Sequence, residues 1–228
     1  MTACSYIIQR ELDARARQSM GISSAAIYTM VAKALDESQG GGGVLIDVGC
    51  GAGNLWPFVR TRFDRYIGID VVRFEGFPAD AEFHRVDLET SKVPLQEDSA
   101  DVVAAVETIE HLESPRAFMR ELVRLSKPGG WVIVTTPNLL SLLSLLTLVV
   151  RHRFAAFQDV DYPAHRTALL EVDLRRIAAE SRLTEVDIAY SHEGRIPLTP
   201  WHYPKFLARL FPRALSDNLL LIGRKPGG

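Results

Sequence analysis

The chain has 228 residues, of which 47% are hydrophobic and 24% are charged, a balance typical of a folded protein with a buried core rather than of a disordered chain. Its 26 basic and 28 acidic side chains give a formal charge of −2. This overall charge shows no basic surplus, so nucleic acid is not an expected partner.

The cysteines and the N-terminus bear on the cellular compartment. Cys4 lies in the N-terminal segment and Cys50 lies within a glycine-rich turn, so a structural disulfide is not expected. The N-terminal stretch MTACSYIIQRELDARARQ lacks the basic-then-apolar order of a secretory signal. These features favour a cytoplasmic protein.

Helix and strand signals alternate along most of the chain. Apolar residues recur at helical spacing over residues 11–38, and four glycines at 40–43 end this predicted helix. Strands are predicted at 44–49, 66–71, 81–86, 101–107 and 130–136. A helix is predicted at 114–126, with Ser114 as its N-cap and Pro115 in its first turn, and KPGG stops it. This alternation predicts a mainly parallel sheet with helices on both faces.

The C-terminal half begins with an apolar segment, LLSLLSLLTLVV at residues 139–150, which is followed by the basic residues of 151–153. It is shorter than the roughly 20 residues that span a bilayer. A helix here would have a narrow hydroxyl stripe and a wide leucine surface. Either it packs on the domain or lines a binding pocket, or residues 139–153 make peripheral contact with a membrane. Two further strands, 183–190 and 218–225, flank a predicted helix at 204–215.

The first predicted strand runs into three closely spaced glycines, Gly49, Gly51 and Gly53. In an open parallel sheet, ligands bind beyond the carboxyl ends of the strands, where bare backbone allows close approach. Asp70 ends the second strand, at the sequence distance from which a carboxylate accepts hydrogen bonds from ribose hydroxyls. Asp87 ends the third strand, where it could accept from an adenine amino group. Together they predict an adenosine-containing cofactor.

The type of cofactor follows from the spacing of the glycines and from one carboxylate. The pattern is G-x-G-x-G rather than the G-x-G-x-x-G of nicotinamide enzymes, and Asn54 holds the place of the third dinucleotide glycine. Asp47 would repel a pyrophosphate but would tolerate an ammonium or a sulfonium. S-adenosylmethionine is therefore the predicted cofactor.

Five stretches follow one another across residues 44–138: IDVGCGAGN, YIGIDVV, FHRVDLE, ADVVAAVETIEHLESP and LVRLSKPGGWVIVTTPN. Together they resemble the class I S-adenosylmethionine-dependent methyltransferases. The resemblance implies a Rossmann-like α/β fold whose seven-stranded, mostly parallel sheet ends in an antiparallel C-terminal strand pair. It also implies cofactor contacts from Asp47, Gly49, Gly51, Gly53, Asp70, Asp87, Leu88 and Glu107.

The fourth predicted strand ends in ETIEHLESP, whose EHL part resembles that of ubiquinone-pathway O-methyltransferases. His111 is the candidate catalytic base, because the unperturbed pKa of histidine is about 6.5, and the alternative is a histidine that only fixes the loop. The strand is not followed by the Asn/Asp-Pro-Pro-aromatic signature of amino-nitrogen methyltransferases. We therefore predict O-methylation of a small molecule, a glycan or a lipid-linked acceptor, with carbon and nitrogen acceptors left open.

Two alternatives stay open. E-x-x-E-H also resembles the metal-binding motif of small-RNA 3′-terminal 2′-O-methyltransferases, in which case Glu107, Glu110, His111 and His165 would hold Mg²⁺ or Mn²⁺. We assign no metal ligand, because EHL at this place is widespread among methyltransferases of small molecules. The other alternative is a non-catalytic module that binds S-adenosylmethionine.

The sequence contains neither an internal repeat nor a low-complexity linker, which indicates one domain. We predict a single methyltransferase domain over residues 1–228. Its parts are an N-terminal helical segment (1–43), the cofactor-binding core (44–137), an acceptor-side insertion and helix (138–182) and the C-terminal strands (183–228). His165 and Arg166 precede that helix and could reach the methyl acceptor. The identity of the methyl acceptor and the oligomeric state stay open.

Overall fold

The computed structural model describes residue 21 and residues 23–227. The part of the predicted helix 11–38 that precedes residue 21 lies outside these residues, as does Cys4. Within the described part, that helix is α2 (Ala25–Glu37), and it buries Ile27, Val31 and Leu35 on one side.

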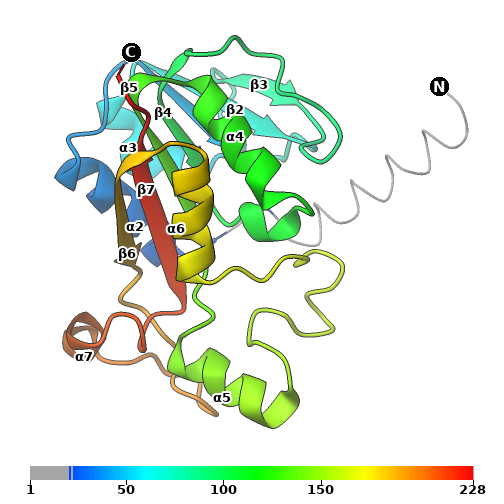
Figure 1. Ribbon diagram of the computed structural model, residues 1–228, viewed down its shortest axis with the longest axis vertical. Coiled ribbons are helices and arrows are strands. Elements are labelled where there is room, and N and C mark those ends of the chain that lie inside the picture. Colours follow the sequence, from blue (N-terminus) through cyan, green and yellow to red (C-terminus); the bar gives the residue numbers. More distant parts are fainter. Residues whose placement is uncertain (1–20, 22, 228) are drawn as a thin grey trace, which may run out of the picture.

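Seven strands form one sheet in the order β3-β2-β1-β4-β5-β7-β6 (Figure 1). The strands are β1 (Val44–Val48), β2 (Arg65–Asp70), β3 (Glu82–Arg85), β4 (Ala100–Ala105), β5 (Ser126–Pro137), β6 (Thr184–Tyr190) and β7 (Asn218–Arg224). The first five pair in parallel, whereas β7 lies between β5 and β6 and is antiparallel to both. The predicted seven-stranded fold with its antiparallel C-terminal ending is confirmed.

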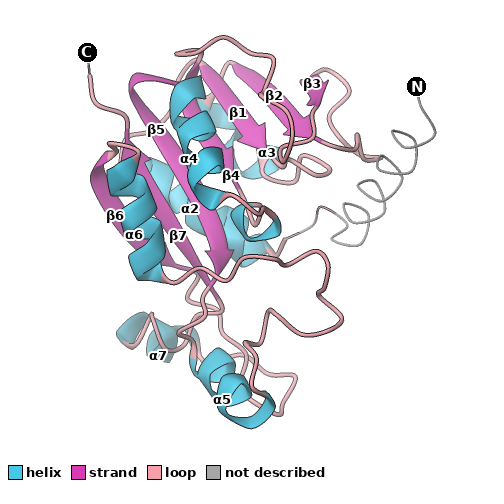
Figure 2. Cartoon of the chain, turned by 45° about the vertical axis from the view of Figure 1, so that its right-hand side comes forward, coloured by secondary structure: helices cyan, strands magenta, loops and turns pink. Residues whose placement is uncertain are grey.

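Helices cover both faces of this sheet (Figure 2). The helices that pack on the sheet are α2, α3 (Trp56–Val59), α4 (Pro115–Leu125) and α6 (Glu171–Glu180). Helices α5 (Leu142–Arg151) and α7 (Lys205–Leu210) lie beyond one end of the sheet (Figure 1). Successive side chains of a strand point to opposite faces. Accordingly, Leu45 packs into the cluster formed with α2 and α3, while Ile46 packs into the cluster formed with α4 and α6. The sheet is therefore buried on both faces, which explains the apolar runs in its sequence.

Two element boundaries and one capping interaction differ from the sequence prediction. The strand expected at 130–136 begins at Ser126, because the pairing of β4 with β5 shifts register between Ala100 and Val102 and accommodates KPGG as an irregularity inside β5. Ser114 occupies the N-cap position of α4, but its side chain makes no capping hydrogen bond. The helix predicted at 204–215 ends at Leu210, since the residue that precedes Pro212 is restricted to non-helical conformations.

Candidate functional site

A cavity of about 720 Å³ lies beyond the carboxyl ends of the parallel strands. Six of the eight predicted cofactor-binding residues line it: Asp47, Gly49, Asp70, Asp87, Leu88 and Glu107. The candidate base His111 also lines it, whereas Gly51 and Gly53 do not. The structure thus gathers residues from four strand ends around one space, as the topology of an open parallel sheet requires.

The glycine turn is shaped by close backbone packing. Gly49 has a φ of 77°, and a Cβ there would clash with the side chain of Thr108. Gly51 has a φ of 52°, and its Cβ would clash with the backbone of Gly21. Only glycine takes both this conformation and this proximity without strain. Gly49 therefore lets the Thr108 side chain approach the turn, and it also lines the cavity, while Gly51 lets residue 21 approach; cofactor contact by Gly51 and Gly53 stays a prediction.

Asp47 is a buried carboxylate at the end of β1. Its Oδ2 accepts a hydrogen bond of 2.7 Å from the hydroxyl of Tyr66, and its Oδ1 has no partner among the described residues. Burial raises the pKa of Asp47 to about 7, although the Tyr66 hydrogen bond opposes the shift. An unpartnered buried oxygen beside a cavity is suited to a cationic ligand, because a nearby positive charge would stabilise its ionised form.

Asp70 and Asp87 are held by backbone donors. Asp70 accepts from the backbone N–H of Gly51 at 2.9 Å through Oδ2 and from that of Val71 at 2.7 Å through Oδ1. Burial raises the pKa of Asp70, and these backbone donors oppose the rise. Asp87 accepts from the Glu89 N–H at 3.0 Å. Each carboxylate is thereby fixed in orientation at the cavity wall. Asp70 Oδ1 also accepts from the Val72 N–H at 3.4 Å, so Oδ2 of Asp70 is the oxygen that retains a lone pair for a ligand hydroxyl.

Glu107 follows β4 with a φ of 50° and is tied to two other strands. Its Oε1 accepts from the Thr135 hydroxyl at 2.9 Å, and its Oε2 accepts from the Asn218 amide at 2.8 Å. Burial, together with the nearby charge of Glu110, raises its pKa well above the ordinary value. Sequence reasoning missed Thr135 and Asn218, because no local pattern connects them to a residue as far away as Glu107.

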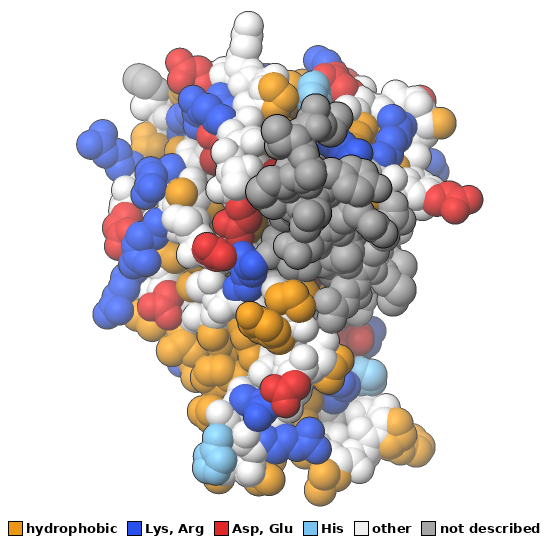
Figure 3. Space-filling view, turned by 90° about the vertical axis from the view of Figure 1, so that its right-hand side faces the viewer, with side chains coloured by type: hydrophobic (Ala, Val, Ile, Leu, Met, Phe, Trp, Pro, Cys, Tyr) orange, Lys and Arg blue, Asp and Glu red, His pale blue; other side chains and the backbone are white. Residues whose placement is uncertain are grey.

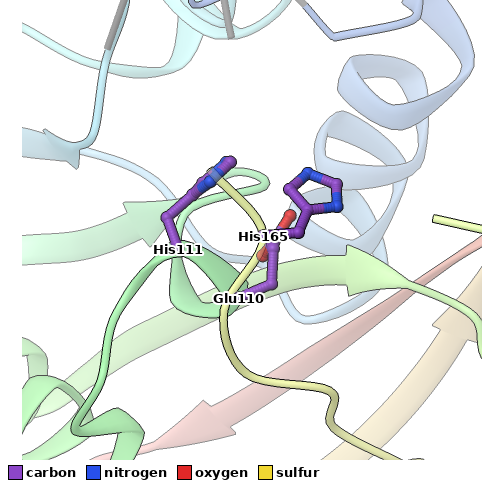
Figure 4. Close-up of side chains that lie close together, drawn as sticks. All are labelled: Glu110, His111 and His165. Carbon is purple, nitrogen blue, oxygen red and sulfur yellow. The ribbon is translucent and has the colours of Figure 1, made fainter. Parts of the chain in front are cut away.

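Glu110, His111 and His165 form a second cluster at the cavity (Figure 4). One potential ligand atom from each lies within 4.8 Å of the others. Glu110 is fully buried, and neither of its carboxylate oxygens has a hydrogen-bond partner among the described residues. Burial raises the pKa of Glu110 to about 8. Such an uncompensated buried carboxylate is costly unless a ligand or a proton neutralises it.

The two histidines of this cluster are oriented by backbone carbonyls. His111 Nδ1 lies 2.9 Å from the carbonyl oxygen of Ala164, and His165 Nδ1 contacts that of Ala156. A carbonyl only accepts hydrogen bonds, so both Nδ1 atoms are assigned the proton and Nε2 is the basic nitrogen of each neutral ring. Burial lowers the pKa of His165, which favours the neutral ring. The ring centroids are 4.9 Å apart.

A short backbone contact brings His165 to His111. The N–H groups of Arg166 and Thr167 both donate to the carbonyl of Glu110, at 2.9 and 3.0 Å. The guanidinium of Arg166 pairs with Glu113 and lies 3.5 Å from Glu89. Of the two residues expected to reach the methyl acceptor, His165 lines the cavity and Arg166 does not. Arg166 instead fastens the loop that carries His165.

The apolar segment 139–150 forms α5, and no residue of α5 lines the cavity. Of the two alternatives for a helix that stays with the domain, packing on the protein is observed, since Ser141 and Ser144 are buried, and lining of this cavity is not. The loop after it does contribute, through Ala155 and Ala156. Within the residues that the structure describes, no helix is long and apolar enough to cross a bilayer.

Comparisons with known proteins agree with this geometry. The family model for a methyltransferase domain matches residues 23–186. The chain is 31% identical over 105 residues to a ubiquinone biosynthesis O-methyltransferase of Leptothrix cholodnii, covering 41% of this chain and 44% of that protein. It is 33% identical over 97 residues to a probable S-adenosylmethionine-dependent methyltransferase of Mycolicibacterium smegmatis, covering 41% and 38%. These matches span less than half of either relative.

The fold itself has close structural counterparts. The structure of an S-adenosylmethionine-dependent methyltransferase from Archaeoglobus fulgidus is similar with a TM-score of 0.63. The two share 16% sequence identity, and the similarity covers 87% of this chain and 94% of that one. At this identity the likeness concerns the fold, because one fold carries many activities.

Proposed function

Because the chain belongs to the methyltransferase domain family, we propose that it moves a methyl group from S-adenosylmethionine to an oxygen of a small molecule, a glycan or a lipid-linked acceptor. The observation that carries the proposal is the meeting of Asp47, bare Gly49 and Asp70 at one cavity. Oxygen as the acceptor atom is supported by the relatives named O-methyltransferases.

The residues present fit this cofactor, which supplies a methyl group on a positively charged sulfur when bound. Asp47 Oδ1, buried and unpartnered, would accept from the ammonium of its methionine end. Asp70 would accept from the ribose hydroxyls, and Asp87 with Leu88 would contact adenine. Gly49 would contact the ligand through its backbone, since it lines the cavity.

In the proposed reaction, the chain must hold the methyl acceptor and remove the proton from its hydroxyl. His111 takes that proton at Nε2, because its Nδ1–H is engaged with the Ala164 carbonyl. The same carbonyl then stabilises the imidazolium that forms, since it accepts a hydrogen bond from a positively charged donor. His165 lies beside this ring and completes the wall of the cavity.

The proposal is tested with the full chain, S-adenosylmethionine and a panel of phenols, sugars and prenylated phenols. We expect saturable binding of S-adenosylmethionine in calorimetry, and formation of S-adenosylhomocysteine with an oxygen acceptor. Binding without turnover across chemically diverse acceptors would favour the non-catalytic module. Absence of binding would contradict the assignment of the cavity.

The pKa of Asp47 predicts a pH dependence of cofactor binding. The ammonium binds the ionised carboxylate, so affinity is present above about pH 7 and is lost as the pH falls through the pKa of Asp47, which is about 7. From about pH 7 to about pH 5.5, affinity should fall on the order of tenfold, while an amino group with a pKa near 7.7–8.0 stays charged. Calorimetric Kd values across this range measure the effect.

The matched variant for this prediction is Asp47→Asn. Its side-chain oxygen can still accept from Tyr66, but it cannot ionise, so the loss of affinity between about pH 7 and pH 5.5 should largely disappear. The other carboxyls of the cavity titrate in both proteins and cancel in the comparison. If the Kd of Asp47→Asn depends on pH in the same way as that of the unchanged chain, Asp47 does not bind the ammonium group.

As an alternative to the base role of His111, we infer that Glu110, His111 and His165 can hold a divalent cation, which would favour ionisation of a bound hydroxyl; His111 Nε2 would then be a metal ligand and not the base. Two imidazoles and a carboxylate are a ligand set for divalent metals, and metal-binding histidines usually donate their second N–H to a carbonyl, as both do here. Glu107, the fourth residue of the metal alternative, is instead bonded to Thr135 and Asn218. The cluster supports metal-assisted methylation without selecting RNA as the acceptor.

Metal binding is tested with chelator-treated full chain and Mn²⁺, followed by paramagnetic resonance and calorimetry. One Mn²⁺ should bind per chain, and His165→Ala should weaken its binding by at least 10- to 100-fold. Replacing a residue that only hydrogen-bonds a metal ligand already weakens metal affinity by that factor, so the loss of a ligand should weaken it at least as much. His202→Ala is the control, because His202 lines the same cavity outside the cluster. Failure of both Mn²⁺ and Zn²⁺ to bind would leave His111 as the base alone.

A further inference from the structure

Helix α5 has its polar and apolar sides reversed relative to an ordinary surface helix. The hydroxyl-bearing residues Ser141 and Ser144 are buried, at 3% and 2% exposure. Ser141 caps the helix by accepting from the Ser144 N–H at 3.2 Å, and Ser144 Oγ accepts from the Ala155 N–H at 3.3 Å. Val149 and Val150, in contrast, are 74% and 73% exposed. The hydroxyl stripe therefore faces the protein and the apolar side faces outward.

A second exposed apolar set lies at the same end of the molecule, on α7 and the residues beside it (Figures 1 and 2). Trp201, Phe206 and Leu210 are each about 70% exposed. The Leu142 N–H at the start of α5 donates to the carbonyl of Ala214 at 2.8 Å, which fastens the two segments together. We call residues 138–157 and 194–216 together the basal lobe. Scattered single apolar residues need no explanation, but a joint set on one lobe marks an interaction surface.

The charge of the basal lobe has one sign. It contains six Arg or Lys residues and no Asp or Glu, whereas the remainder of the chain has 20 basic and 28 acidic side chains. Arg153, Arg195 and Arg213 pair with acidic residues outside the lobe. Among the described residues, no ion-pair partner faces the other three, which are Arg151, Lys205 and Arg209. Figure 3 shows basic and hydrophobic side chains together at the lower end of the molecule.

The inner side of the basal lobe is a wall of the cavity. Ala155 and Ala156 contribute to this wall from the first segment, and Arg195 and His202 contribute from the second. The exposed apolar side chains and the unpaired cations lie on the same lobe as these lining residues, and none of them lines the cavity itself. A partner docked on the lobe would lie next to that space.

We propose that the basal lobe docks on the surface of an anionic lipid bilayer. Exposed valine, leucine, phenylalanine and tryptophan side chains enter the interface, and the unpaired cations contact anionic headgroups, as in helices that lie in the plane of a membrane. RNA would use the cations but would leave the aliphatic side chains of α5 in water. The docked orientation presents the cavity wall to amphipathic methyl acceptors in the bilayer. Docking itself is independent of the proposed reaction.

The test is flotation of the full chain with vesicles, without cofactor or methyl acceptor. The chain should bind vesicles made of equal parts phosphatidylcholine and phosphatidylglycerol, and binding should weaken with added salt and on pure phosphatidylcholine. Val149→Glu should reduce partitioning by roughly tenfold or more, because an exposed apolar contact is replaced by a charge that anionic lipid repels. The matched control is Val172→Glu, at an exposed valine of α6 outside the lobe.

A triple variant tests the cations. Changing Arg151, Lys205 and Arg209 to glutamine should lower partitioning on the order of 100-fold, since each cation near an anionic surface contributes about 1 kcal/mol. The control with the same charge change replaces the exposed Arg60, Arg120 and Arg176.

Circular dichroism and an unchanged affinity for S-adenosylmethionine verify that the variants are folded. No vesicle binding, or equal binding by all variants, would overturn the proposal. So would self-association of the chain through Val149, or binding to single-stranded RNA without binding to vesicles.

Discussion

Replacing His111 by alanine is expected to lower kcat by roughly 10²- to 10⁴-fold, the contribution of a positioned general base. Cofactor affinity should stay nearly unchanged, because Asp47, Asp70 and Asp87, which are proposed to bind the cofactor, lie on other strand ends. Single-turnover rates and calorimetry measure the two effects separately. Added imidazole can take over proton transfer in the variant, but it cannot restore a loop that depended on the histidine side chain. Partial recovery of kcat with imidazole would therefore identify His111 as a proton-transfer residue.

The control for this prediction is His84→Ala. His84 lies on β3, bonds Glu82 and does not line the cavity, so its loss should leave kcat unchanged. Normal turnover in His111→Ala would show that His111 is not the base and only holds the loop in place through its contact with the Ala164 carbonyl. A loss of turnover that returns with metal rather than with imidazole would favour the cation site.

Replacing Asp70 by alanine is expected to weaken S-adenosylmethionine binding on the order of 1.5–3 kcal/mol, or about 10- to 100-fold in Kd. The change removes a charged acceptor from the proposed ribose site. It also frees the Gly51 N–H that Asp70 holds at 2.9 Å. Asp70→Asn separates the two effects, since its one remaining oxygen can still accept from the turn.

Calorimetry with the folded variants measures this loss. Asp64→Ala is the control, because Asp64 is exposed, lies just before β2 and has no described ion-pair partner. An affinity equal to that of the unchanged chain would place the ribose elsewhere. A loss in Asp70→Ala that Asp70→Asn fully restores would assign Asp70 to the turn rather than to the ligand.

Local patterns in the sequence determined most of the sheet and part of the site. All seven strands lie close to their predicted positions, because buried parallel strands are short apolar runs with glycine or proline at their ends. Asp47, Asp70 and Asp87 were predicted to lie together, and the cavity confirms that they line one space. This prediction succeeds because the carboxyl ends of parallel strands necessarily meet at one edge.

Other features depend on contacts between residues that are distant in sequence. Asn218 bonds Glu107 only because β7 inserts between β5 and β6. His165 joins His111 only because the backbone after it donates to the Glu110 carbonyl. Neither contact has a periodic or spacing signal, so sequence reasoning named His111 and His165 without placing them side by side, and it missed Asn218.

The basal lobe shows the same division most clearly. Sequence alone predicted a helix with a hydroxyl stripe at residues 139–150, and the helix is present. Which stripe faces the protein was decided by the hydrogen bond from the Ala155 N–H to Ser144, a tertiary contact. The formal charge of −2 likewise gave no sign of a basic lobe, because net charge is a sum over the whole chain. Folding brings together residues 138–157 and 194–216, two basic segments that are some 40 residues apart in the sequence. Periodicity therefore determined the elements, and tertiary packing decided which of their faces meet solvent.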